Sequence, residues 1–346
     1  MKRWVLTAIS FAAVIGVSVY AVLSGATSGL SLAIPASAHL LALLAFASEV
    51  SARSLKLTWS AKAVGTRLPF MTSVRTSLGG DFGAAITPAR AGAEPARFLI
   101  LAEAGIAATD AMVILYAELF FEMISLAIVV IAIALIFDAS SNAFLAMVGV
   151  VGGYAAFVLG LGALAVVLAS RTVGEEPPGW ARRLRLHGKR WDLVQRWFGR
   201  VRTVVQAFRT MHRGWALASL TASVAHVAVR FTILPAIVYS TTSAAVPLAP
   251  LVVWPLGIIY GAGVVPAPGG GGAVELAFRA ALGRVIPPDI FGAALVWWRF
   301  YTFYIYIALG ALVAGNTALR AVREAQDVEE EFENAVPEPE PPGRSA

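Results

Sequence analysis

Six runs of apolar residues, each about as long as a membrane is thick, constrain this chain more than any other feature. An α-helix needs about 20 consecutive apolar residues to cross the hydrocarbon core of a bilayer. Composition agrees, since charged residues make up 14% of the chain, against about 25% in typical soluble domains. The runs are residues 4–23, 33–52, 109–137, 143–169, 215–240 and 290–315. They predict an all-α integral membrane protein, a polytopic helical bundle.

Basic residues between the runs predict the orientation of the chain. Lys2 and Arg3 precede the first run, which is longer than the apolar part of a usual signal peptide. Segment 171–213 holds eleven Lys and Arg residues against three acidic ones, and Arg53 and Lys56 follow the second run. Because cytoplasmic segments are enriched in Lys and Arg, we expect these segments and both termini to be cytoplasmic. The net charge of +6 then reflects topology, and no nucleic-acid binding is predicted.

Two further apolar regions are interrupted by proline and glycine, so neither fits one regular span. Residues 66–100 are broken near Pro88 and Gly92, and residues 247–285 are broken by Pro266–Gly272. The orientation of the flanking runs predicts that each region enters and leaves the membrane by the same face. The result would be two inverted units, each containing a broken re-entrant hairpin, as in many transporters. The alternative is a first region partly in the cytoplasm and a second region that forms a kinked span plus an interfacial helix.

Irregular backbone at membrane depth is tolerated only inside protein or beside a water-filled cavity. The interrupted regions therefore predict a polar cavity. A helix that begins near Ala273 would present free N–H groups to an anion such as a phosphate. A flexible hinge without a ligand is the alternative for this glycine-rich segment.

Ionisable residues inside apolar runs are costly unless they are paired or hydrated, and they mark candidate sites. Glu118 and Glu122 are four residues apart and share a helix face, and Arg230 and Arg299 lie within runs. A structural ion pair of Glu122 with Arg230 or Arg299 is the alternative to a functional role.

Three charged residues near the first break, Arg90, Glu94 and Arg97, are spaced to line one face of a helix. With them, the predicted substrate-binding residues are Arg90, Glu94, Arg97, Glu118, Glu122, Arg230, Gly269, Gly270, Gly272, Glu275 and Arg299. The predicted hinge residues are Pro88, Gly92, Pro266 and Pro268.

No short enzyme motif occurs in the sequence, which also has no cysteine. No catalytic residue, metal ligand or cofactor is therefore predicted. A membrane-embedded lipid-modifying enzyme that uses Glu and Arg remains the alternative, because such a site needs no short signature.

Residues 1–320 are predicted to form the transmembrane domain, and two segments outside the spans carry signals of their own. Residues 189–213 alternate apolar and basic side chains at helical spacing, which is typical of a helix lying on an anionic membrane surface. The alternative is a cap packed on the bundle. Residues 321–346 are acidic and rich in proline, which predicts a disordered tail.

Three motifs, in this order, resemble those of one protein family. They are the segment from Ala85 to Arg97, the segment Val265-Pro-Ala-Pro-Gly-Gly-Gly-Gly-Ala-Val-Glu275, and Trp298-Arg-Phe-Tyr-Thr-Phe-Tyr304. The chain is similar, over about 35–315, to the flippase-like transmembrane region of the lysylphosphatidylglycerol synthase family.

This resemblance implies a protein of the bacterial cytoplasmic (inner) membrane that translocates, by flipping or scrambling, an anionic phospholipid or a lipid-linked precursor. An accessory subunit of lipid or glycolipid synthesis is a further alternative beside the enzyme. Two positions depart from the family pattern, Ala85 where Asn is common and Leu119 where many members carry Arg. No aminoacyl-transferase domain follows the last span in this sequence, so synthesis of a lysyl lipid is not expected. The matched positions are Pro88, Arg90, Gly92, Glu94, Arg97, Pro268, Gly269, Gly270, Gly272, Glu275 and Arg299.

Overall fold

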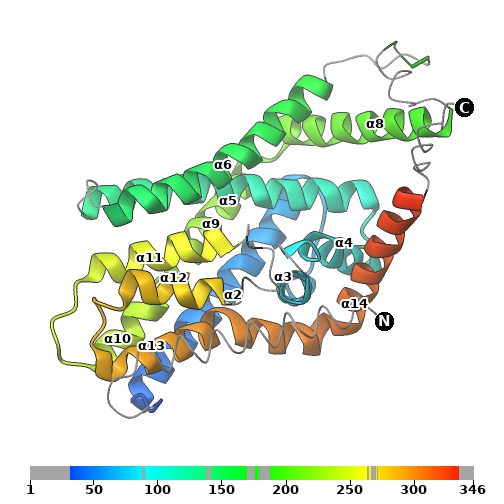
Figure 1. Ribbon diagram of the computed structural model, residues 1–346. Helices are drawn as coiled ribbons and strands as arrows, with labels where there is room; N and C mark the ends of the chain where they lie inside the picture. The colour runs from blue at the N-terminus through cyan, green and yellow to red at the C-terminus, as the bar shows by residue number, and fades with distance from the viewer. Residues whose placement is uncertain are drawn as a thin grey trace, which may run out of the picture.

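The protein is built from helices, and the predicted all-α class is confirmed (Figure 1). The computed structural model describes residues 32–87, 90–137, 142–169, 176–177, 179, 188–262, 265, 270 and 272–334, and no strand occurs in them. The helices are α2 (Ala36–Ala63), α3 (Phe70–Ile86), α4 (Ala93–Glu103), α5 (Ala108–Ile136), α6 (Asn142–Ala169), α8 (Lys189–Thr210), α9 (Arg213–Arg230), α10 (Ile233–Thr241), α11 (Leu248–Gly261), α12 (Ala273–Leu282), α13 (Pro288–Arg299), the π-helix η4 (Phe300–Tyr304) and α14 (Ile305–Asn334).

Four helical segments of the described residues are long and apolar enough to cross a membrane. They are Ala108–Ile136, Phe144–Val167, Arg213–Thr241 and Pro288–Thr317, which confirms four of the six predicted spans. The predicted span 33–52 is part of α2, which continues to Ala63 and is too polar to count among the four. The predicted span 4–23 lies outside the described residues.

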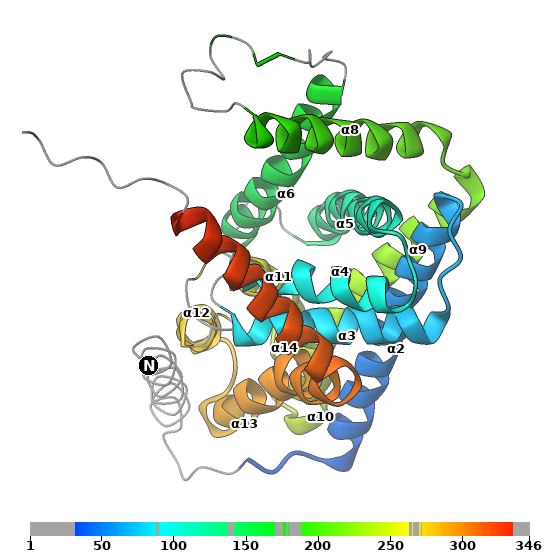
Figure 2. The same ribbon diagram turned by 90° about the vertical axis from the view of Figure 1, so that its right-hand side faces the viewer.

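Helix α2 lies at the centre of the bundle. It packs against α9 and α10 along one side and against α3 and α5 on others. Small residues allow the close contact with α9. The Ser60 and Ser219 hydroxyls lie 2.8 Å apart, and the Ser219 hydroxyl also donates to the Lys56 carbonyl at 3.0 Å. Figures 1 and 2 show α6 and α8 on one side of the molecule and α13 and α14 on the opposite side.

The region 66–100 forms a hairpin of two helices, α3 and α4. Glycines let the helices approach closely, because a Cβ added at Gly80 would lie 2.6 Å from the Cγ of Arg97. The Thr87 hydroxyl fixes the turn, since it donates to the Gly83 carbonyl and accepts from the Gly92 amide, each at 2.8 Å. Pro88 lies outside the described residues.

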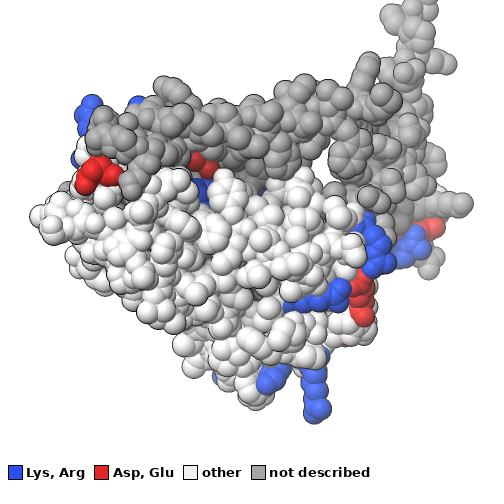
Figure 3. All heavy atoms as spheres, turned by 90° about the horizontal axis from the view of Figure 1, so that it is seen from below, with Lys and Arg blue, Asp and Glu red and all other residues white. Residues whose placement is uncertain are grey.

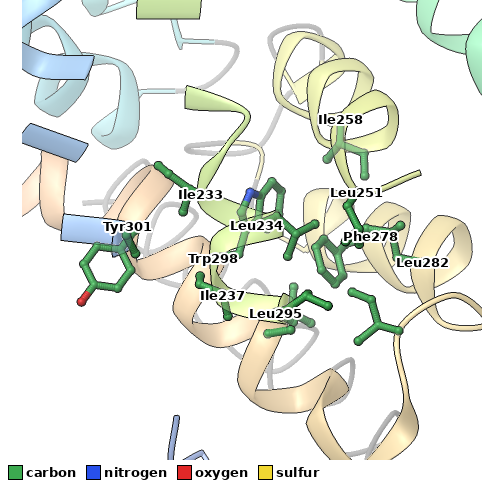
Figure 4. Close-up of a cluster of buried hydrophobic side chains, with 14 of the residues drawn as sticks. Ile233, Leu234, Ile237, Leu251, Ile258, Phe278, Leu282, Leu295, Trp298 and Tyr301 are labelled. Carbon is green, nitrogen blue, oxygen red and sulfur yellow. The ribbon is translucent and has the colours of Figure 1, made fainter. Parts of the chain in front are cut away.

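The region 247–285 also contains two packed helices, α11 and α12. They join α10 and α13 in an apolar core, in which Phe278 stacks on Trp298 with ring centroids 4.9 Å apart (Figure 4). Pro266, Pro268 and Gly269 lie outside the described residues. The re-entrant position of the two hairpins and their inverted relation remain predictions, because both depend on where the membrane lies.

One face of the molecule is largely without charge. Figure 3 shows Lys, Arg, Asp and Glu mainly towards the edges of the face seen from below. Large apolar side chains are exposed on several helices, among them Leu135 at 83%, Leu312 at 81% and Phe157 at 65% exposure. Apolar surface on this scale favours contact with lipid.

Helix α8 is the segment predicted to lie on an anionic membrane surface. Its apolar face packs on α5 and α6, where the Phe208 and Phe120 rings meet edge to face at 5.6 Å. Arg196, Arg200 and Arg209 point outward and are exposed. The contacts favour the alternative of a cap on the bundle for the apolar face, and membrane binding by the basic face stays a prediction.

Helix α14 extends to Asn334, past residue 321 where the predicted disordered tail begins. Disorder of the tail stays a prediction. Glu, Ala, Gln and Arg dominate residues 320–333, and these are good helix formers. Residues 335–346 lie outside the described part of the chain.

Candidate functional site

Three charged residues of α2 form the centre of the candidate site. Glu49, Arg53 and Lys56 are spaced four and three residues apart, so they share one helix face. All three are buried, with residue exposures of 0%, 9% and 0%. Burial of a charge is tolerated only when partners are present, and each of the three has them.

Two hydrogen-bond partners and two nearby guanidinium groups surround the Glu49 carboxylate. The Tyr306 hydroxyl donates to Glu49 Oε2 at 2.7 Å, and His226 Nδ1 lies 3.1 Å from Oε1. Two guanidinium groups lie farther away, Arg53 Nε at 3.7 Å and Arg230 Nη1 at 3.9 Å. Arg53 is held more tightly by Asp81 of α3, with Nη2 and Oδ2 2.6 Å apart. One carboxylate thus links α2 with α9 and α14.

Lys56 holds the two glutamates of α5. Its Nζ lies 2.9 Å from Glu118 Oε1 and 2.9 Å from Glu122 Oε2. Glu118 also pairs with Arg97 of α4, and the Tyr260 hydroxyl donates to Glu122 Oε1 at 3.3 Å. The alternative in which Glu122 forms an ion pair with Arg230 or Arg299 does not hold, because Glu122 pairs with Lys56 and Arg299 pairs with Glu275.

A small polar cavity opens beside this ion-pair cluster, with a volume of about 20 Å³. Its lining comes from α3, the turn before α4, α9, η4 and α14. The lining residues are Asp81, Ala84, Arg90, Arg230, Thr302, Phe303, Tyr306 and Ile307. Two cations therefore face a cavity whose single acidic residue, Asp81, is already paired with Arg53.

Arg90 stands apart from the other arginines of the bundle. It has a left-handed backbone, with φ of +61°, which is uncommon for a residue other than glycine. No hydrogen bond or ion pair to its side chain occurs among the described residues. It precedes α4, so the prediction that it shares a helix face with Glu94 and Arg97 is wrong. The turn that follows Thr87 places it at the cavity.

Arg230 ends α9, where Pro235 interrupts the helix by removing a backbone donor and α10 begins. Its Nη2 donates to the Thr302 carbonyl of η4 at 3.3 Å. Its Nε is buried and has no hydrogen-bond partner in the part of the chain that the structure describes. Arg230 is therefore only partly neutralised.

Glu275 and Arg299 form a separate pair, with Arg299 Nε donating to Glu275 Oε1 at 2.8 Å. The other oxygen of Glu275 accepts from the Gly272 amide at 2.8 Å, and Gly272 has φ of +78°. The Arg299 guanidinium also lies 4.2 Å from the centre of the Phe303 ring. The start of α12 is thus occupied by its own carboxylate rather than left open to an external anion.

Three further residues of the predicted site lie outside these clusters. Glu94 is exposed, with 63% of its side chain accessible, and pairs with Arg97 at 3.0 Å. Gly92 precedes α4, and Gly270 has a left-handed backbone against Ala262.

Sequence reasoning missed Glu49, Arg53, Lys56 and Tyr306 as members of the site. The signal that identifies the first three is their shared helix face beside a long apolar run.

Comparison with known proteins bears on this site as a whole. The model of one protein family, described as the lysylphosphatidylglycerol synthase TM region, matches residues 4–310. The match covers α2 to α13, η4 and residues 305–310 of α14, and so includes every residue that lines the cavity. No curated protein matches the chain.

Proposed function

Because this chain belongs to the lysylphosphatidylglycerol synthase transmembrane family, we propose that it moves an anionic phospholipid or an anionic lipid-linked precursor between membrane leaflets. The phosphate of the headgroup would bind to Arg90 and Arg230 at the polar cavity, which would have to widen to admit it. The acyl chains would stay in the bilayer. The proposal is a refinement of the family relationship, which indicates a membrane protein related to lipid metabolism.

The observation that carries the proposal is the side chain of Arg90. Buried or half-buried arginines elsewhere in the bundle are committed, Arg53 to Asp81, Arg97 to Glu118 and Arg299 to Glu275. Arg90 has a cavity in front of it instead of a carboxylate. Planar guanidinium groups are well suited to phosphate oxygens, so an external phosphate is the partner that this arrangement favours.

We infer different tasks for the other residues. The Arg53–Asp81, Lys56–Glu118–Glu122 and Arg97–Glu118 pairs hold α2, α3, α4 and α5 together around the cavity. Arg230 would add a second donor to the phosphate, since its tie to Glu49 is long. Movement of one helical unit against the other would then change the leaflet to which the cavity opens.

Transport by variants in liposomes tests this proposal. Purified protein is reconstituted with a trace of fluorescent phosphatidylglycerol, and dithionite added outside reports the rate at which inner-leaflet lipid reaches the surface. A hydrogen bond between charged groups contributes about 1.5–3 kcal/mol, which is roughly a tenfold to hundredfold change in affinity. Arg90→Gln is expected to slow the transfer by that factor at low lipid, and Arg230→Gln by less.

Arg284→Gln is the matched control, because Arg284 is an exposed arginine between α12 and α13 and does not line the cavity. Its transfer rate should equal that of the unaltered protein. Equal transfer rates for Arg90→Gln and Arg284→Gln would contradict binding of the headgroup at this cavity. Covalent conversion of the lipid without accelerated transfer would favour the membrane-enzyme alternative.

A further inference from the structure

His226 is the one buried histidine among the described residues, and its ring is only half satisfied. The residue is 2% exposed, and its Nδ1 lies 3.1 Å from Glu49 Oε1. Since a carboxylate accepts, Nδ1 carries the hydrogen in this pair. Its Nε2 is buried without a hydrogen-bond partner in the described part of the chain. An open lone pair on a buried imidazole is a place where a proton can bind.

Glu49, the hydrogen-bond partner of His226, also contacts two residues that line the cavity. Glu49 accepts from the Tyr306 hydroxyl at 2.7 Å and lies 3.9 Å from Arg230 Nη1, and both Tyr306 and Arg230 line the cavity. A positive charge on His226 would strengthen its hold on Glu49. Arg230 would then be freer to turn its guanidinium towards an anion.

The surrounding charges decide when that proton binds. Burial opposes a positive charge on His226 most strongly, and Lys56 on α2 adds to this, whereas Glu49 on α2 and Glu122 on α5 favour the charge. Arg53 and Arg230 lie around the same Glu49 carboxylate, and Asp81 of α3 is neutralised by Arg53. Tyr306 of α14 is the remaining titratable group on this carboxylate. An anion beside Arg90 and Arg230 adds negative charge to a region rich in cations and so favours one more proton.

We propose that His226 takes up one proton when an anionic headgroup enters the cavity and releases it when the headgroup leaves. The headgroup and the proton would then move together, so that a proton gradient could drive lipid transfer. This inference rests on the proposed function of the cavity. Coupling of this kind is reciprocal, because a ligand that favours proton binding is itself bound more tightly when the proton is present.

Isothermal titration calorimetry measures the coupling directly. Short-chain phosphatidylglycerol, a phosphodiester whose own charge is constant, is titrated into the detergent-solubilised protein at about pH 6.5, the usual range of histidine. Titrations in two buffers of different ionisation enthalpy give the number of protons taken up per lipid. We expect uptake approaching about one proton, and affinity that rises up to about tenfold per unit fall in pH while His226 titrates.

Variants assign the proton to its site. His226→Gln should bind the lipid without proton uptake and with affinity independent of pH, and His226→Asn is the second variant if the first does not fold. His39→Gln is the matched control, since His39 lies on α2, the helix that carries Glu49, but bonds to Tyr301 at 3.0 Å. It should keep the full uptake.

The outcomes separate the two proposals. Failure of the unaltered protein to bind phosphatidylglycerol would contradict the proposed function of the cavity. Binding without proton uptake by the unaltered protein would overturn only the inference about His226, whatever the variants do. Equal uptake by the unaltered protein and by either folded His226 variant would assign the proton to another group and overturn it as well.

Discussion

Replacement of Lys56 by methionine tests whether the ion-pair cluster holds the bundle together. Methionine keeps the unbranched apolar stem of lysine but removes the charge. Glu118 would retain Arg97, whereas Glu122 would keep only the Tyr260 hydroxyl at 3.3 Å. Loss of one partner from a buried ion pair costs about 3–5 kcal/mol. Because 23% of the Glu122 side chain is accessible, we expect the lower end, about 3 kcal/mol.

Thermal unfolding in detergent measures this loss. At about 2 °C per kcal/mol for a long chain, Lys56→Met should lower the melting midpoint by about 6 °C, compared at one scan rate because unfolding of such proteins is often irreversible. The double variant Lys56→Met/Glu122→Gln should recover much of the loss, since it removes the unpaired charge. Lys62→Met is the control on the same helix, where a cation–π contact with Trp215 at 4.4 Å contributes about 0.5–1 kcal/mol.

Two results would refute this reasoning. The first is a melting midpoint for Lys56→Met that equals that of Lys62→Met. The second is a double variant that is no more stable than the single one, which would mean that the unpaired Glu122 is not the source of the loss.

Two further comparisons test the packing and the second ion pair by the same melting assay. Gly310→Ala should destabilise strongly, because its Cβ would collide with the backbone of α3, whereas Gly315→Ala should be neutral, with its nearest neighbour at 3.9 Å. Glu275→Gln should cost about 3–5 kcal/mol by leaving buried Arg299 without a counter-ion. Glu94→Gln should change the free energy of unfolding by less than about 0.5 kcal/mol, because surface pairs contribute little, and an equal loss for both glutamates would contradict the structural role of Glu275.

Apolar run length predicted the helical class and most spans because it depends only on local sequence. Proline and glycine predicted the two breaks for the same reason, since they act on their own backbone. The boundaries of α2 were not predicted from hydropathy, because polar residues of its second half are buried by neighbours. Positive-inside counting placed Lys56 at the membrane edge, whereas the structure buries it completely.

The sequence pattern did not predict which charged residues form ion pairs with one another. The sequence shows that Glu118 and Glu122 share a face and that Arg230 lies in an apolar run, but not which faces meet. Lys56 reaches both glutamates because α2 crosses α5, and this crossing depends on the packing of the whole bundle. Arg90 lies at a polar cavity, as the sequence predicted, but not because of a position on a helix face. Its left-handed backbone before α4 places it there.

The π-helix η4 lets one continuous helical segment form polar contacts with two different helices, α12 and α2. Arg299 and Tyr306 are seven residues apart, and in a regular α-helix they would point within about 20° of each other. Here Arg299 bonds to Glu275 of α12 and Tyr306 to Glu49 of α2. A π-turn holds one residue more than an α-turn, which rotates everything after it by about 100°. Deletion of one residue within 300–304 would therefore turn the distal half of this segment away from the cavity while leaving its proximal half seated in the apolar core.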